Sequence, residues 1–397
     1  MSTLKFKNLR FSKQDNKVKV IFLKIYYFYL NKKDLEKIGK FSVNKNSINF
    51  KTDKKPENIR QKFDFLLSKG FQKLKCTIND KPALYIHKNS GIPLIGTNEF
   101  GVIDRDTNTI EIKPLTTCNI DCIFCSVDHR KRNKDIIVEA DYLIEELKKV
   151  IKIKENRVNV HIGSQGDPSL YGDLIRLVRE IRKIKKVNAI SMVTNGILIT
   201  RTMADKLINA GMTHFHFSIH SLDEKKADYL ANSKYPVKKI MKTCRHIVKK
   251  AHLLIVPVWL HGINDKDIEE IVKFGKEIKA DLGIQNFLEY NFGKKPVNPL
   301  PMKVFYKKLE ELEKKLDINL TSLDSSLEFK EDTKLKKPYR KGDIIKADIK
   351  AKSRMRNTML AVADNRVITV INCSKDKGVV KVKLIRDKHN IFTGVLA

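Results

Sequence analysis

The stretch Cys118-Asn119-Ile120-Asp121-Cys122-Ile123-Phe124-Cys125 contains three of the six cysteines of this 397-residue chain. Its C-x3-C-x2-C spacing can place three thiolates on one tight loop. Thiolates are the usual ligands of iron–sulfur clusters, and a cubane needs four ligands. Because only three are present here, one iron would stay open to a ligand from outside the protein.

A zinc site is the alternative for this octet, since His129 follows closely and would complete a Cys3His ligand set. A disulfide is not expected, because three neighbouring cysteines leave one unpaired. Clustered thiols are typical of metal ligands or catalysts in a reducing compartment, and we therefore expect a cytoplasmic protein.

The octet, with an aromatic residue directly before its last cysteine, resembles the signature of the radical S-adenosylmethionine (radical SAM) superfamily. By this resemblance Cys118, Cys122 and Cys125 ligate a [4Fe-4S] cluster, and Phe124 occupies the aromatic position. The resemblance further implies that SAM binds the open iron and that an external electron donor reduces the cluster. A 5′-deoxyadenosyl radical would then abstract hydrogen from an unreactive C–H bond.

The sequence from Thr109 onward alternates strand-like runs with helical patterns of about 10 to 15 residues, which predicts βαβ units and a parallel sheet. A β-hairpin is expected over 101–113, and helices are expected over 140–153, 171–186, 203–210, 240–250, 265–278 and 302–316. The expected strands are 109–113, 158–162, 189–193, 214–219, 253–260 and 282–288. Six strands suit the partial (βα)6 barrel of radical SAM cores, in which the cysteine loop follows the first strand.

Three further motifs follow predicted strands. Gln165-Gly166-Asp167-Pro168 is similar to the Gly-Gly-Glu-Pro element of the family, which contacts the SAM amine, but it has Gln for Gly and Asp for Glu. Thr194-Asn195-Gly196 resembles the family's Thr-Asn-Gly turn. The stretch 218–223 is similar to one in the molybdopterin-biosynthesis cyclases, with His220 in place of an Asp. The resemblance implies SAM contacts by Phe124, Gln165, Gly166, Asp167, Thr194, Asn195 and Ser218.

The charge balance is strongly basic, with 79 Lys and Arg against 46 Asp and Glu and a formal net charge of +33. A hot habitat raises Glu as well as Lys and does not by itself produce this imbalance. Such an excess attracts polyanions, and nucleic acid is the common case. The apolar run 20–30 is too short to span a bilayer and reads as a buried strand, so no membrane partner is expected.

Four segments are expected. Residues 1–95 form an α+β accessory domain, 96–318 the core, 319–333 a linker and 334–397 a small basic β-barrel of about five strands. The last segment has 17 Lys and Arg against 5 Asp. It resembles a TRAM domain, the OB-like RNA-binding module of several tRNA-modifying enzymes; a basic structural cap is the alternative.

These features predict a radical SAM enzyme that modifies RNA, in particular tRNA, by C–H functionalisation such as methylation. Methylthiolation is doubtful, because residues 1–117 contain only Cys76 and so lack the ligands of a second cluster. Cys244 and Cys373 are candidate methyl-carrying or hydrogen-donating thiols, with isolated packed cysteines as the alternative. Two other functions stay open: a radical SAM enzyme acting on a small molecule or a nucleotide-derived cofactor precursor, and a non-catalytic RNA-binding iron–sulfur protein.

Overall fold

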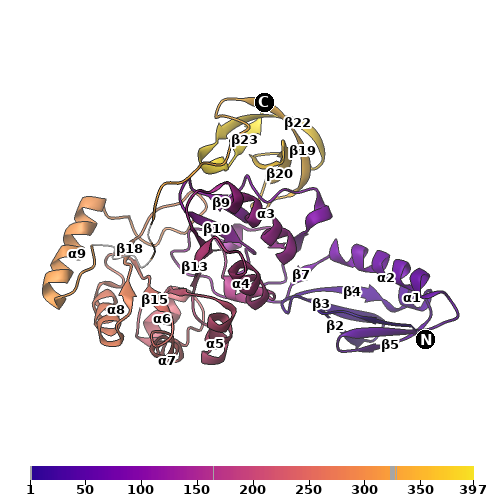
Figure 1. Ribbon diagram of the computed structural model, residues 1–397, viewed down its shortest axis with the longest axis horizontal. Helices are drawn as coiled ribbons and strands as arrows, with labels where there is room; N and C mark the ends of the chain where they lie inside the picture. Colours follow the sequence, from indigo (N-terminus) through magenta and orange to yellow (C-terminus); the bar gives the residue numbers. More distant parts are fainter. Residues whose placement is uncertain (1, 164, 322–326, 328) are drawn as a thin grey trace.

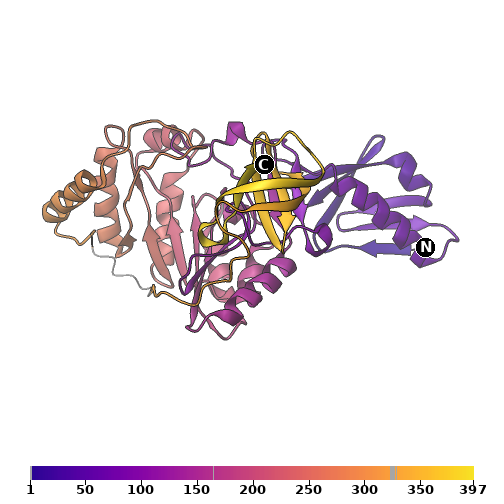
Figure 2. The ribbon, with the colours of Figure 1, turned by 90° about the horizontal axis from the view of Figure 1, so that it is seen from above.

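The computed structural model describes residues 2–163, 165–321, 327 and 329–397. Figure 1 shows the N-terminal unit at one end of the long axis, the core along the rest of it and the C-terminal barrel above the core. Seen from above in Figure 2, the barrel lies over the middle of the molecule.

The N-terminal unit has two antiparallel sheets and a long helix, which confirms the expected α+β type. One sheet has the order β1-β6-β5 and the other the order β2-β3-β4-β7. The elements are β1 (Ser2–Lys5), β2 (Leu9–Gln14), β3 (Lys17–Phe22), β4 (Tyr26–Asn31), α1 (Lys32–Glu36), β5 (Lys40–Asn44), β6 (Ser47–Lys51), α2 (Pro56–Phe71) and β7 (Lys75–Cys76).

The prediction of a single buried strand over 20–30 is wrong. The run contains the end of β3, a turn and most of β4, and Leu23 and Lys24 in the turn have φ values of 46° and 73°. The apolar pattern continues through the turn because Leu23 is itself buried. Continuous hydrophobicity therefore concealed the reversal of the chain.

The core is a seven-stranded sheet of order β17-β15-β14-β13-β12-β10-β9, in which only the edge strand β9 is antiparallel to its neighbour. The predicted hairpin and the six parallel strands are confirmed in their predicted order, while the (βα)6 barrel description stays a prediction. The strands are β9 (Gly101–Asp104), β10 (Thr109–Lys113), β12 (Val158–Ile162), β13 (Val187–Thr194), β14 (His214–Phe217), β15 (His252–Ile255) and β17 (Asp281–Leu282).

The last two predicted strands are each interrupted. After β15 and β17 the chain continues as β16 (Val258–Trp259) and β18 (Gln285–Asn286), which pair with each other in a separate parallel sheet. Pro257 lies between β15 and β16 and has no N–H to donate, which explains the first interruption.

Helices cover the sheet and agree best with prediction where their periodicity is long. The bounds of α3 (Ala140–Ile153), α8 (Asp265–Ile278) and α9 (Met302–Leu316) match the predicted ranges. The expected helices over 171–186, 203–210 and 240–250 are α4 (Leu174–Arg182), α5 (Arg201–Ala210) and α7 (Val237–Ile247). The short α6 (Glu224–Ala231) was not predicted; Asp223, assigned above to a motif, is its N-cap and accepts a hydrogen bond from Lys226 N at 2.8 Å.

A parallel pair that the sequence did not predict joins the first segment to the core. β8 (Ala83–Ile86) pairs in register with β11 (Asp135–Val138), which follows the cysteine loop. Although β8 lies within the predicted segment 1–95, it therefore packs on the core rather than within the N-terminal unit.

The C-terminal segment is a closed barrel of order β19-β20-β21-β23-β22, which confirms the prediction of a five-stranded barrel. Phe392, Val382 and Ile368 are completely buried in its core. The likeness to a TRAM domain stays a prediction. The strands are β19 (Ile344–Lys352), β20 (Thr358–Ala363), β21 (Arg366–Ile371), β22 (Gly378–Arg386) and β23 (Thr393–Leu396).

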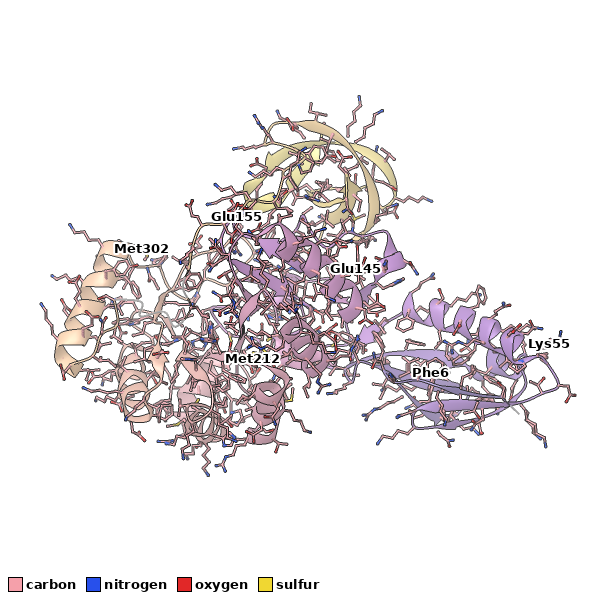
Figure 3. The ribbon with its side chains drawn as sticks, viewed as in Figure 1. Phe6, Lys55, Glu145, Glu155, Met212 and Met302 are labelled. Carbon is pink, nitrogen blue, oxygen red and sulfur yellow. The ribbon has the colours of Figure 1, made fainter. Side chains whose placement is uncertain are left out.

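The predicted linker 319–333 lies partly outside the described residues, which omit 322–326 and 328. Its last part is fastened to the core, because Asp332 accepts hydrogen bonds from Glu155 N at 2.8 Å and Asn156 N at 3.1 Å. Figure 3 shows Glu155 where the core meets the barrel. In the part of the chain that the structure describes, no helix is long and apolar enough to cross a membrane.

The barrel docks on the core through a close backbone approach at Gly96. Phe392 N donates to Gly96 O at 2.8 Å, and Val367 N donates to Ile95 O at 2.8 Å. Gly96 has a φ of 129°, and a Cβ at this position would lie 2.2 Å from Val367 O. Glycine is therefore required both by the backbone conformation and by the contact.

We expect Gly96→Ala to lower the free energy of unfolding by roughly 2 kcal/mol or more, because strain and a clash coincide there. Gly378→Ala is the matched control: its φ is 86° and nothing lies within 4 Å of its Cβ position. Urea unfolding of both variants tests this, and equal losses would contradict the proposed clash.

Candidate active site

A cavity of about 550 Å³ opens where the parallel strands of the core end. Its lining brings together all ten residues that were predicted for the metal and cofactor sites, from the cysteine octet, the end of β13 and the loops after β12, β13 and β14. These residues are Cys118, Cys122, Phe124, Cys125, Gln165, Gly166, Asp167, Thr194, Asn195 and Ser218.

The cysteine loop is held in place by backbone hydrogen bonds. Asp121 N donates to Ala231 O at 3.1 Å and Ile123 N donates to Leu230 O at 3.0 Å, at the end of α6. On the other side, Lys294 N donates to Cys125 O at 2.9 Å. The middle and the C-terminal end of the octet are thus held by the protein before any ligand binds.

A buried ion pair closes the base of the loop. Arg132 Nη1 lies 3.0 Å from Asp135 Oδ1, and the two side chains are only 1% and 0% exposed. Arg132 also donates to Thr116 O, and Asp135 Oδ2 accepts from Asn79 Nδ2 at 3.0 Å. These contacts join the residues before and after the octet.

The three thiols are partly buried and line the same cavity. Burial raises the pKa of Cys118 to about 12 and raises the pKa of Cys122 and Cys125 as well; the charges of Arg132 and Lys294 lower the pKa of Cys125 and so act against burial. Ligation requires thiolates, so binding of a cluster must release protons from this loop.

The arrangement fits a cubane better than a zinc ion. Among the described residues, no three His, Cys, Asp or Glu side chains converge on the position of a single ion. A cubane binds each thiolate through a different iron, so its ligands lie farther apart than ligands around one zinc ion. His129, the possible fourth zinc ligand, lines the cavity but contacts the guanidinium of Arg132.

Asp167 is the centre of a hydrogen-bond network that joins two strand ends. Its carboxylate accepts hydrogen bonds from Ser169 N at 2.8 Å, Asn195 N at 2.7 Å and Thr194 Oγ1 at 3.0 Å. Burial raises the pKa of Asp167, while these donors act to lower it. Protein donors thus occupy most of the acceptor sites of this carboxylate.

Gln165 and Gly166 face the cavity in front of Asp167. In the described part of the chain, Gln165 Oε1 is buried and has no hydrogen-bond partner. A Cβ on Gly166 would lie 2.0 Å from Thr117 O, so only glycine lets this loop approach the cysteine loop. A buried acceptor beside the thiols fits a cofactor with a hydrogen-bond donor, such as the ammonium group of SAM.

The remaining predicted residues form the cavity wall. Asn195 Nδ2 donates to Asn119 Oδ1 at 2.8 Å and so ties the turn after β13 to the cysteine loop. Phe124 packs edge-on against His220, with the ring centroids 4.6 Å apart. His220 Nδ1 accepts from Val258 N at 3.0 Å, and burial lowers its pKa to about 3, which keeps the ring neutral.

The candidate catalytic thiols lie elsewhere. Cys244 is completely buried on α7, and Cys373 is buried in the core of the C-terminal barrel, where its Sγ lies 3.4 Å from Lys375 O. Neither lines the cavity. Their packing in apolar surroundings matches the alternative of isolated structural cysteines.

Three further lining residues had no predicted role in the site. Leu288, Tyr290 and Met302 line the cavity, although each is nearly half exposed. Figure 3 shows Met302 at the start of α9. Leu288 and Met302 were predicted only as parts of a strand and a helix, and Tyr290 lies outside the predicted elements.

This chain is similar to several known proteins. A family model described as the Radical SAM superfamily matches residues 112–275. "Uncharacterized protein MJ0103" of Methanocaldococcus jannaschii is 34% identical over 383 residues, which cover 86% of this chain and 87% of the relative. A "Probable GTP 3′,8-cyclase" of Pyrococcus horikoshii is 25% identical over 222 residues, covering 54% of this chain and 66% of the cyclase. Streptococcus suis SuiB bound to precursor peptide SuiA gives a TM-score of 0.45 at 15% identity, covering 80% of this chain and 71% of SuiB.

The matched range contains every predicted cofactor residue, from Cys118 to Ser218. The predicted cofactors, a [4Fe-4S] cluster and SAM, are confirmed, and so is the assignment as an enzyme. The chain belongs to the radical SAM superfamily.

Proposed function

We propose that this radical SAM enzyme modifies RNA, in particular tRNA, at a C–H bond. The distribution of charge carries the proposal. Residues 1–95 hold 22 Lys and Arg against 7 Asp and Glu, and residues 334–397 hold 17 against 5, whereas the 238 residues between them hold 40 against 34. Most of the basic excess therefore belongs to the two units that flank the catalytic core, as expected for a polyanionic substrate.

The outer face of the C-terminal barrel supports this proposal. Lys346 of β19 lies directly opposite Lys381 of β22, and Ile344 lies opposite Lys383. Like charges directly opposite each other destabilise a sheet, and a bound phosphate would relieve that repulsion. Ile344 is 63% exposed and Val379 is 65% exposed, so the same face also offers apolar contacts.

When bound and reduced by an external electron donor, the cluster and SAM supply the radical chemistry that breaks a C–H bond. The chain binds and orients them. Cys118, Cys122 and Cys125 would hold the cluster, and Asp167 would fix Thr194 and Asn195 at the cavity wall. We assign the contact with the SAM ammonium to Gln165 Oε1, because the carboxylate of Asp167 is already occupied by protein donors.

A second candidate is a reaction on a nucleotide-derived small molecule. The similarity to proteins named GTP 3′,8-cyclase favours it, and a cavity of about 550 Å³ is in the usual size range of a small-molecule site. This candidate does not account for the basic units on either side of the core. Mass spectrometry of tRNA nucleosides from cells with and without the gene separates the two, since a small-molecule enzyme leaves the tRNA nucleosides unchanged.

We expect Asp167→Asn to weaken SAM binding about tenfold, because an amide would point a donor at the donors of Thr194 and Asn195 at a cost of about 1–3 kcal/mol. Iron content should not change, since the cysteine loop is held by other contacts. Equilibrium binding of SAM to anaerobically reconstituted protein measures this. Asp141→Asn, a substitution at an exposed ion pair with Arg176, is the control. Unchanged SAM affinity in Asp167→Asn would contradict the assigned role.

RNA affinity should fall steeply as salt rises, and Lys346→Gln with Lys381→Gln should reduce the slope of log affinity against log salt by about 1.4, or 0.7 per phosphate contact. The control is Lys206→Gln with Lys249→Gln, two exposed lysines on the helical side of the core. Binding of labelled tRNA at several salt concentrations tests this. If the wild-type protein binds no RNA at low salt, the proposed function is wrong.

A further inference from the structure

The second N-terminal sheet has one apolar face and one face of aromatic and basic side chains. Tyr26, Phe28 and Leu30 of β4 are buried, and α2 packs on their side of the sheet. Because side chains alternate along a strand, the residues between them point to the opposite face. That open face presents Arg10, Lys17, Lys19, Tyr27, Tyr29 and Lys75.

The register places these side chains beside one another. Lys19 lies directly opposite Tyr29, and Tyr27 lies opposite Lys75. Lys19 Nζ is 4.5 Å from the ring centroid of Tyr27, and the two tyrosine rings are 5.6 Å apart at 78°. Amino groups thus alternate with aromatic rings across neighbouring strands.

Both kinds of side chain are accessible. Tyr29 is 42% exposed, although Lys17 Nζ lies 5.7 Å from its ring centroid. β2, β3 and β4 contain no Asp or Glu, and Asp80 at the sheet edge pairs with Lys75. The face therefore combines net positive charge with an exposed aromatic ring.

The sheet meets the core beside the cysteine loop, through the first residue of β4 on its buried face. Tyr26, which precedes Tyr27 on β4, is hydrogen-bonded to Thr117 at 2.8 Å, and Thr117 directly precedes Cys118. Lys81, shortly after β7, donates to Arg132 O at 2.9 Å. A chain bound along this sheet would thus approach the part of the core that contains the active site.

We propose that this face binds single-stranded RNA, with a base stacked on Tyr29 and phosphates held by Lys17 and Lys19. Stacking on aromatic side chains requires unpaired bases, and lysines spaced along a sheet neutralise the backbone between them. The inference rests on the proposed function, because it assigns part of the RNA substrate to the N-terminal unit.

The test uses the full-length protein and a labelled single-stranded RNA of about 12 nucleotides, a length within the range that one such surface covers. We expect Tyr29→Ala to weaken binding about tenfold and Tyr29→Phe to leave it unchanged, because the ring is kept. Lys17→Gln with Lys19→Gln should lower the salt slope by about 1.4. Lys40→Gln with Lys51→Gln is the matched control, since these lysines face each other on β5 and β6 of the same unit.

The outcomes distinguish this inference from the proposed function. If the wild-type protein binds RNA and the open-face variants bind it as well as the Lys40/Lys51 control does, the inference is wrong and the proposed function stands. If Tyr29→Ala weakens binding of a duplex of the same sequence as much as it weakens binding of the single strand, the inference is also wrong, because paired bases cannot stack on Tyr29. If the open-face variants bind RNA as the wild-type protein does but no longer bind an acidic peptide, the face binds a protein partner instead of RNA.

Discussion

The ion pair between Arg132 and Asp135 is the constraint on which the active site depends. Both side chains are almost completely buried, and together they bond to Thr116 on the other side of the cysteine octet. Breaking a buried pair by removing one partner usually costs about 3–5 kcal/mol, because a charge is left without compensation. The fold itself therefore closes the base of the loop that presents the thiols. The backbone conformation of this loop does not depend on a bound metal.

Both flanking units contribute to that closure. Asn79 and Lys81 of the N-terminal segment bond to Asp135 and to the backbone of Arg132. From the C-terminal barrel, Arg354 O accepts a hydrogen bond from Asn133 N at 2.6 Å. The segment just after the thiols thus lies between three parts of the chain that are distant in sequence. Both flanking units therefore contact residues 132–135 directly.

Local patterns predicted much of this molecule and failed where distant segments meet. The periodicity over α3, α8 and α9 and the spacing of Cys118, Cys122 and Cys125 depend on neighbouring residues, and the structure agrees with them. The pairing of β8 with β11 joins segments some 50 residues apart, and nothing in either sequence specifies the partner. Asp167 shows the same limit: its motif predicted a cofactor contact, but two of its donors, Thr194 Oγ1 and Asn195 N, come from a strand end that no local pattern connects to it.

The excess of Lys and Arg in the flanking units indicates that these units do more than pack against the core. A basic excess within a folded unit costs stability through self-repulsion, and nothing in the cores of these units requires it. The catalytic core shows that this chain can balance its charges, since its Lys and Arg nearly match its Asp and Glu and its buried charges pair, as in Lys154 with Asp104 at 2.7 Å. Most of the excess positive charge lies outside the core, on units that also fix the thiol loop. Binding of a polyanion by these units would therefore act on the same residues that position the cluster.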